Sequence, residues 1–280
     1  MPRIKTNDDI PDVQNDTEGF VKKYIPKVGS RNIRVPLEII RRDGTVNPTC
    51  GVLSIYTDLE ADKKGTNMSR YRILVEEAVA NKTHRIDELV DYLLDECKNR
   101  IGSQNAYIKV NFEYFLIKEA PVSKTKSHMS YKGSFAGKLV DGVKRFYLSA
   151  NVLYASCCVC SKNISDYGAH NQQSFADVTV ELDQIKDRNN LYWFEELVEA
   201  VEKSVSAPMW NALKRVDEAY VTELMYEQAL FIEDCVRNIS TVLDAELDKR
   251  IKDYLVVCEH FESIHQSQVC SVIHANRELK

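Results

Sequence analysis

The sequence predicts an α+β protein that repeats one arrangement of strands and helices. Two segments rich in β-branched residues precede two segments with helical periodicity, and two more strand-like segments follow. The order of strands, helices and strands then recurs in the second half of the chain. Long helices on one face of antiparallel strands are typical of an α+β layer architecture. Two tandem copies of one unit, written ββαα-ββ, are therefore predicted.

Each element of the first half has its own signal. Segments 34–40 and 51–59 resemble strands, and Arg42-Asp43-Gly44-Thr45 indicates a turn between them. A helix is expected over 71–80, and alternation over 106–116 predicts a half-buried strand. Apolar spacings of three and four predict a further helix with a face made of Ile86, Leu89, Val90, Leu93, Leu94, Cys97 and Ile101.

A hairpin leads into the second half. Segments 135–140 and 143–155 are separated by Asp141-Gly142, which is a hairpin signal. Segments 146–156 and 174–182 predict strands on either side of a loop rich in cysteine and histidine. A helix follows, with apolar positions at Phe194, Leu197, Val198, Val201 and Val205.

The last part of the chain completes the repeat. Segment 221–248 is predicted to be mostly helical with a break near Asn238, and 254–261 and 269–275 are predicted strands. No repeat is visible residue by residue.

Three regions are therefore predicted. Residues 1–31 form a polar, irregular N-terminal segment, 32–142 the first unit and 143–280 the second unit. The second unit carries most of the candidate metal-binding and catalytic residues.

Composition narrows the class of protein. The 280 residues are 44% hydrophobic and 28% charged, with ten glycines and seven prolines, as in an ordered globular protein. There is no apolar run of membrane-spanning length and no apolar signal-peptide core at the start, so we expect a cytoplasmic protein without membrane partners. Eight cysteines in a reducing compartment indicate thiols or metal ligands rather than disulfides. A net charge of −5 gives no general reason to bind nucleic acid.

One loop concentrates metal-binding side chains. Cys157, Cys158 and Cys160 fall within four residues, and His170 follows ten residues after Cys160. Thiolate sulfur and imidazole nitrogen are ligands that zinc and similar metals prefer. The alternative is a set of small buried side chains, because free cysteine is often buried. The spacing alone does not decide between these interpretations.

The residues around this loop resemble the hallmark of the type IB GTP cyclohydrolases, which are tunnelling-fold enzymes. The similar stretch reads C-x-C-S-K-x-I-S and then G-A-H-N-Q-x-S, with Val159 where proline is usual. Asn67 and Ser130 replace the family's usual histidine and aspartate. Similar segments extend along nearly the whole chain, at 10–14, 64–70, 118–123, 128–131, 214–223, 231–234 and 262–265.

The resemblance implies a fold, an assembly and a reaction. The fold would be tandem tunnelling-fold domains whose barrel is completed by oligomerisation, in a homo-oligomer, predicted to be a tetramer, with active sites at subunit interfaces. The reaction would convert GTP and water to 7,8-dihydroneopterin triphosphate and formate, feeding folate or 7-deazaguanine pathways. The implied cofactor is a divalent metal, zinc or manganese, with iron as a further option.

Opening a purine ring by water addition at C8 requires an activated water. A bound divalent metal lowers the pKa of its water from about 15.7 to about 7, and an open site uses about three protein ligands. Cys158 and His170 are the strongest candidates, and the family pattern favours Cys158 over Cys160. A carboxylate at 217–218, with Glu218 preferred, would be a further ligand. Its alternative role is an exposed acidic residue at a helix start, where the macrodipole favours it.

The closing E-S-x-H segment provides two further candidates. Histidine is the side chain suited to moving protons near neutral pH, so His265 could move protons on ring nitrogens, or it could bind the metal. Glu262 could accept hydrogen bonds from guanine N1–H and the 2-amino group, an anchoring mode in which tunnelling-fold enzymes resemble one another. The alternative for Glu262 is a solvated residue at a strand end. Cys158, Glu262 and His265 are therefore the predicted catalytic residues.

The triphosphate requires cationic partners. Lys64, Arg70, Lys162 and Arg215 lie in matching segments, although a chain with 37 lysines and arginines has many that are only surface residues.

Two other functions remain open from the sequence. A related archaeal-type enzyme would release a cyclic phosphate product. A non-catalytic protein of this fold would keep only purine or pterin binding, as the departures at Asn67, Ser130 and Val159 suggest. Retention of the four candidates Cys158, His170, Glu262 and His265 argues against the non-catalytic option.

Overall fold

The computed structural model describes residues 19–82 and 85–275. Its strands form one antiparallel sheet in the order β1-β2-β3-β4-β5-β6-β8-β9, and the short β7 (Ala207–Pro208) pairs with β5. The long strands are β1 (Ile25–Ile40), β2 (Val46–Leu59), β3 (Ala106–Glu119), β4 (Lys126–Val140), β5 (Val143–Cys157), β6 (Asn171–Leu182), β8 (Ile251–Glu262) and β9 (Gln268–His274).

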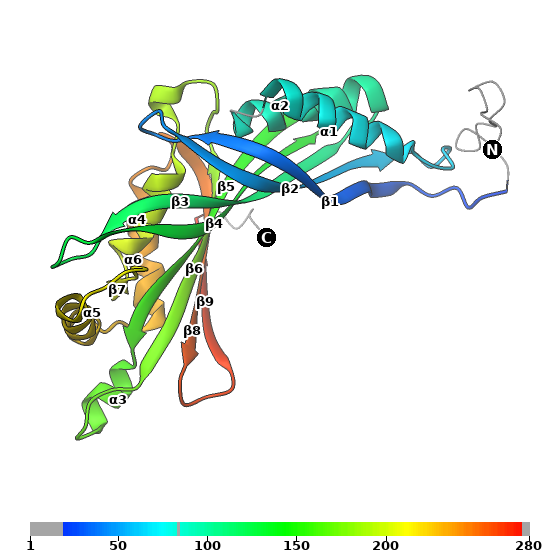
Figure 1. The fold of residues 1–280 in the computed structure, drawn as a ribbon. Coiled ribbons are helices and arrows are strands. Elements are labelled where there is room, and N and C mark those ends of the chain that lie inside the picture. Colours follow the sequence, from blue (N-terminus) through cyan, green and yellow to red (C-terminus); the bar gives the residue numbers. More distant parts are fainter. Residues whose placement is uncertain (1–18, 83–84, 276–280) are drawn as a thin grey trace, which may run out of the picture.

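The helices pack on one face of this sheet, except α3, which lies at the end of the sheet where β5 leads into β6 and buries no residue (Figure 1). They are α1 (Met68–Lys82), α2 (Ile86–Glu96), α3 (Val159–Ile164), α4 (Phe194–Glu202), α5 (Arg215–Glu227) and α6 (Ile232–Asp244), with a π-helical turn at Cys97–Ile101 and a 3₁₀ turn at Arg188–Asn190. Among the described residues, no helix combines the length and apolar character needed to cross a membrane.

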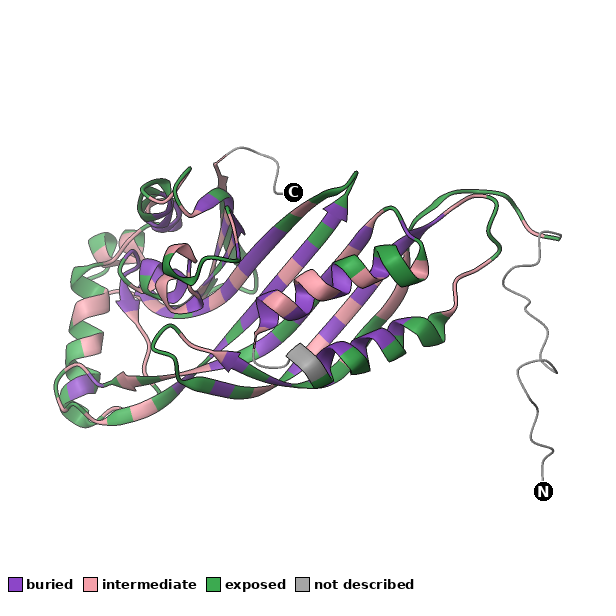
Figure 2. Cartoon of the chain, turned by 90° about the horizontal axis from the view of Figure 1, so that it is seen from above, coloured by how far each residue is buried: buried purple, intermediate pink, exposed green. Residues whose placement is uncertain are grey.

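Alternation along the strands explains this layering. In β3, Ile108, Val110 and Phe112 are buried, whereas the residues between them are more exposed. The striping of buried and exposed residues is visible along the sheet in Figure 2. Helix α2 places Leu89 and Leu93, both fully buried, into the same core. One continuous core therefore extends over both halves of the chain.

The predicted α+β fold and the order of its elements are confirmed. The hairpin at Asp141-Gly142 joins β4 to β5, and these strands pair, so the two series of elements share one sheet. Below, the first series means β1–β4 with α1 and α2, and the second series means the elements from β5 to β9.

Several boundaries differ from the sequence prediction, among them the start of β2 at Val46 rather than residue 51 and the start of α5 at Arg215 rather than residue 221. Strand β1 begins at Ile25, inside the segment expected to be irregular, because Ile25 pairs with Leu59 of β2. Strand β4 begins at Lys126 rather than at residue 135. The predicted helix break near Asn238 is wrong: the break lies at 228–231, and the Asn238 side chain donates to the Ser204 carbonyl at 3.3 Å from within α6. The family-like segment 10–14 lies outside the described residues.

Candidate active site

The connection between β5 and β6 brings Cys158 and His170 together. Strand β5 ends at Cys157, which pairs with Asn171 at the start of β6. The Cys158 N–H donates to the His170 carbonyl at 3.1 Å, and the Cys158 sulfur accepts the Ser161 N–H at 3.4 Å. Cys158 directly follows β5 and His170 directly precedes β6. Because these two strands are neighbours, the two side chains lie close together at the end of the sheet.

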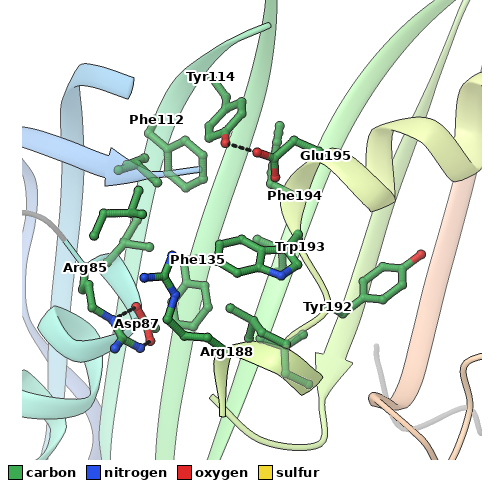
Figure 3. Close-up of a pocket in the computed structure, with 16 residues that line it drawn as sticks. Arg85, Asp87, Phe112, Tyr114, Phe135, Arg188, Tyr192, Trp193, Phe194 and Glu195 are labelled. Atoms are coloured by element: carbon green, nitrogen blue, oxygen red, sulfur yellow. Dashed lines mark hydrogen bonds and ion pairs between the residues drawn. The ribbon is translucent and has the colours of Figure 1, made fainter. Parts of the chain in front are cut away.

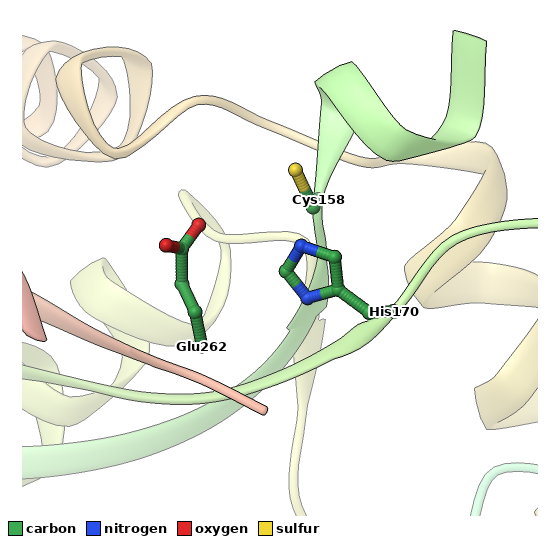
Figure 4. A group of neighbouring side chains, drawn as sticks. All are labelled: Cys158, His170 and Glu262. Atoms are coloured by element: carbon green, nitrogen blue, oxygen red, sulfur yellow. The ribbon is translucent and has the colours of Figure 1, made fainter. Parts of the chain in front are cut away.

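Strand β8 adds a carboxylate to this pair. The register of β6 and β8 places Gln172 opposite Glu262, at the last position of β8. One ligand atom each from Cys158, His170 and Glu262 lies within 4.8 Å of the others, and all three residues are partly buried. Figure 4 shows the three side chains directed toward a common space.

Both Glu262 oxygens already have neighbours. The Gln172 side-chain amide donates to Oε1 at 3.1 Å, and His265 Nε2 lies 3.6 Å from Oε2. A carboxylate only accepts, so the Gln172 carbonyl oxygen must face away, and it is buried without a partner among the described residues. Gln172 lies within the family-like motif around His170, but the motif alone indicates no role for it. Its buried position on β6, opposite Glu262 of β8, becomes apparent only in the structure.

The three cysteines of the loop have different environments. Cys157 is buried, and its thiol donates to the Met225 carbonyl at 3.5 Å, while burial raises the pKa of this thiol. Cys160 is exposed. Of these thiols, only Cys158 belongs to the group with His170 and Glu262.

A buried polar pair lies on β5 and β8. His260 Nε2 lies 2.9 Å from the Tyr154 hydroxyl, and burial lowers the pKa of His260 to about 4. This histidine is therefore neutral at physiological pH and is distinct from the half-exposed His265.

The two acidic residues at the start of α5 differ. Asp217 is fully buried, and its carboxylate accepts the N–H groups of Val122, Ser123 and Lys214 at 2.8–2.9 Å. Glu218 is exposed and lies outside the Cys158–His170–Glu262 group of the chain. Because the Asp217 carboxylate is occupied by these backbone N–H groups, Glu218 is the carboxylate of this pair that could bind a metal.

The predicted phosphate-binding cations are widely separated. Lys162, on α3, donates to the Tyr226 carbonyl at 2.6 Å and lies 4.4 Å from the Tyr226 ring centroid. Arg215 is exposed at the start of α5. Lys64 and Arg70 lie where β2 leads into α1, at the end of the molecule remote from α3 (Figure 1). A single chain therefore does not bring all four to one place.

The donor set of the group fits a divalent metal. Thiolate, imidazole and carboxylate are the ligand types of catalytic zinc, and imidazole with carboxylate also suits manganese. All three side chains are only partly buried, so part of each remains exposed to solvent.

Solved structures share the fold. Uricase from Arthrobacter globiformis superposes with a TM-score of 0.59 at 7% sequence identity, covering 94% of this chain and 97% of that chain. Urate oxidase from Bacillus sp. TB-90 gives a TM-score of 0.55 at 7% identity, covering 90% of this chain and 99% of that chain. The molecule is thus a tunnelling-fold protein.

Sequence relatives define the family within that fold. The family model described as type I GTP cyclohydrolase folE2 matches residues 10–271. GTP cyclohydrolase FolE2 of Aromatoleum aromaticum is 38% identical over 271 residues, which are 96% of this chain and 95% of that protein. The protein of the same name from Pseudothermotoga lettingae is 34% identical over 267 residues, covering 95% and 99% respectively. The chain belongs to the type I GTP cyclohydrolase FolE2 family.

Proposed function

We propose that the protein is a metal-dependent GTP cyclohydrolase of type IB, which converts GTP and water to 7,8-dihydroneopterin triphosphate and formate at the start of folate synthesis. The observation that carries this proposal is the meeting of Cys158, His170 and Glu262 at the end of the sheet in a member of this family. A cytoplasmic location suits a substrate made in that compartment.

Cys158 and His170 are proposed as metal ligands, with Glu218 as the further carboxylate ligand. Glu262, whose carboxylate lies within 4.8 Å of the ligand atoms of both, is assigned to the substrate in this proposal. A bound metal would supply an activated water at neutral pH. Glu218 is exposed on its helix, so it remains available for a site assembled between subunits. Zinc or manganese suits this donor set.

Glu262 and His265 are proposed to act beside the metal. The approach of His265 Nε2 to Glu262 Oε2, at 3.6 Å, supports a proton-transfer pair, because a carboxylate stabilises the imidazolium form. Gln172 would hold the other carboxylate oxygen in place. The role of Glu262 as acceptor for guanine N1–H and the 2-amino group also remains part of the proposal.

A homo-oligomer, a tetramer in our proposal, would complete the site. The outer edges of β1 and β9 have no strand partner in the described chain, and such edges require covering. Val269 and Val272 of β9 are 39% and 53% exposed, which also favours a partner. A neighbouring copy would bring Lys64 and Arg70 toward the triphosphate, with Lys162 and Arg215 as the other cations. In this assembly, 32–142 and 143–280 would act as two tunnelling-fold domains.

Two measurements test the function and the assembly. The purified protein is incubated with GTP, the product is oxidised to a fluorescent pterin, and formate is quantified. We expect one formate per pterin, and a cyclic phosphate product or no turnover would overturn the proposed reaction.

Light scattering should give a tetramer mass, and a monomer at micromolar concentration would contradict the assembly.

A further inference from the structure

A second cavity lies between α2 and the start of α4, and none of its lining residues belongs to the Cys158 site. Its empty space, open solvent at the mouth included, is about 620 Å³. Small-molecule sites are typically hollows with mostly apolar walls and a few placed polar groups. Aromatic and aliphatic side chains from both series form most of its wall, including Ile39, Phe112, Phe135, Leu148, Trp193 and Phe194 (Figure 3).

One end of this cavity has a carboxylate oxygen without a donor. Glu195 Oε1 accepts the Tyr114 hydroxyl at 2.6 Å and the Arg42 backbone N–H at 3.0 Å. Glu195 Oε2 is buried and has no hydrogen-bond partner in the described chain. A desolvated carboxylate oxygen without a donor is costly. Because Oε2 is covered, the Glu195 carboxylate must turn toward the cavity to accept an N–H or O–H group of a bound molecule, and that bond would remove the cost.

The other end presents a cation. Figure 3 shows Arg188 across the group of aromatic side chains from Glu195. The Arg188 guanidinium lies 5.3 Å from the Trp193 ring centroid, and the described residues give it no carboxylate partner. Arg85, at the same end, is paired with Asp87. The uncompensated charge of Arg188 therefore favours an anionic group.

The wall between these two ends is already formed. Phe194 packs on Tyr114 with ring centroids 4.6 Å apart and on Phe112 at 5.7 Å. A Cβ at Gly133 would lie only 2.5 Å from the Phe194 ring, so these rings press directly on the sheet. Such packing suits a flat ligand, because little ordering is needed on binding.

We propose that this cavity binds a small flat aromatic molecule with an N–H donor at the end facing Glu195 and an anionic group at the end facing Arg188. The proposal involves neither the metal site nor GTP, so it stands or falls separately from the proposed function.

The probe is 4-aminobenzoate, which carries an amine and a carboxylate at opposite ends of a benzene ring. Ligand-observed NMR relaxation with the full-length protein should show saturable binding with a dissociation constant of about 1 mM or tighter. Benzoate lacks the amine and aniline lacks the anion, so each should bind about tenfold more weakly. Absence of saturable 4-aminobenzoate binding up to about 10 mM would overturn the proposal.

Two substitutions test the two ends of the cavity. Glu195→Gln retains an acceptor for Tyr114 but presents an amide NH₂ toward the ligand amine. It should weaken 4-aminobenzoate binding about tenfold and leave benzoate binding unchanged. Arg188→Met, at an exposed position, should weaken both ligands about tenfold while leaving aniline binding unchanged. Glu199→Gln, on the exposed side of α4, is the matched control, and wild-type binding by both test variants would refute the site.

Discussion

The first hairpins of the two series have the same place in the fold and different connections. Strands β1 and β2 are joined by a short turn in which the Arg41 N–H bonds to the Thr45 carbonyl at 2.8 Å and Gly44 has a φ of 85°. Strands β5 and β6 are joined by a longer segment that contains α3, Cys158 and His170. The first connection forms a hydrogen bond within its own backbone, whereas the second presents the candidate metal ligands. In our proposal, the shared topology is the scaffold and the β5–β6 connection would supply the chemistry.

The second hairpins repeat this contrast. The connection between β3 and β4 is held by the buried Asp217, which accepts the N–H groups of Val122 and Ser123. The connection between β8 and β9 carries His265 beside Glu262. Changes in second-series connections should therefore reduce catalysis, whereas changes in first-series connections should reduce stability.

The largest effect is expected for Cys158→Ala or His170→Ala. Each change removes a proposed metal ligand, so the folded protein should contain little metal and show no detectable turnover of GTP. Metal content by plasma mass spectrometry and the pterin assay measure both effects. Cys160→Ser, at an exposed thiol, should keep metal and activity, and Cys157→Ala should be nearly silent. Full metal occupancy in Cys158→Ala would refute the assignment.

A large effect of a different kind is expected for Glu262→Gln. The Gln amide NH₂ is a donor, and it would replace a carboxylate oxygen that accepts a hydrogen bond from guanine or faces His265. Each hydrogen bond to a charged carboxylate is worth about 1.5–3 kcal/mol. We expect kcat/KM to fall about 10²-fold or more while the metal stays bound. Loss of the metal from this variant would instead make Glu262 a ligand. Discrimination against ATP by the native protein should be about 10⁴-fold or more, because adenine lacks these donors.

A moderate loss of stability is expected for Asp217→Asn. Burial alone would raise the pKa of Asp217, but hydrogen bonds from Ser123, Lys214 and Val122 hold it well below its usual range. A carboxyl with a depressed pKa stabilises the fold above its unfolded pKa of about 3.9, and this contribution is lost as the pH falls further. The melting temperature of the variant should therefore be lower at pH 7, and the difference from wild type should narrow below about pH 4. A pH-independent difference would contradict this role.

The smallest effect is expected for Gly44→Ala in the first-series turn. Its positive φ disfavours a side chain although the surrounding space is open, so the unfolding free energy should fall by about 1 kcal/mol. Chemical denaturation measures this change. Metal content and turnover should match wild type. A loss of either would contradict the claim that changes in first-series connections reduce stability but not catalysis.

The sequence predicts the fold well where local periodicity carries the information. The apolar spacing of Leu89 and Leu93 and the alternation through Ile108 and Val110 are local patterns, and both elements form as expected. The break between α5 and α6 has no Gly or Pro to indicate it, and Asn238 is accommodated by a carbonyl of a distant segment. Such partners depend on tertiary packing.

The candidate site was predictable only in part. Cys158 and His170 are close in sequence, and a β5–β6 hairpin brings them together. The approach of Glu262 depends on the register of β8 against β6, which pairs residues 90 positions apart. Similarly, the separation of Lys64 and Arg70 from this site appears only when the sheet is assembled.

The central claim is that a metal held at Cys158 and His170 enables cyclohydrolysis of GTP. The most direct test removes the metal from native protein with a chelator, measures pterin formation, and then restores zinc or manganese. Activity should disappear with the metal and return in proportion to the metal rebound, to about one ion per subunit in an open site of this kind. Undiminished turnover by protein shown to be metal-free would contradict the account.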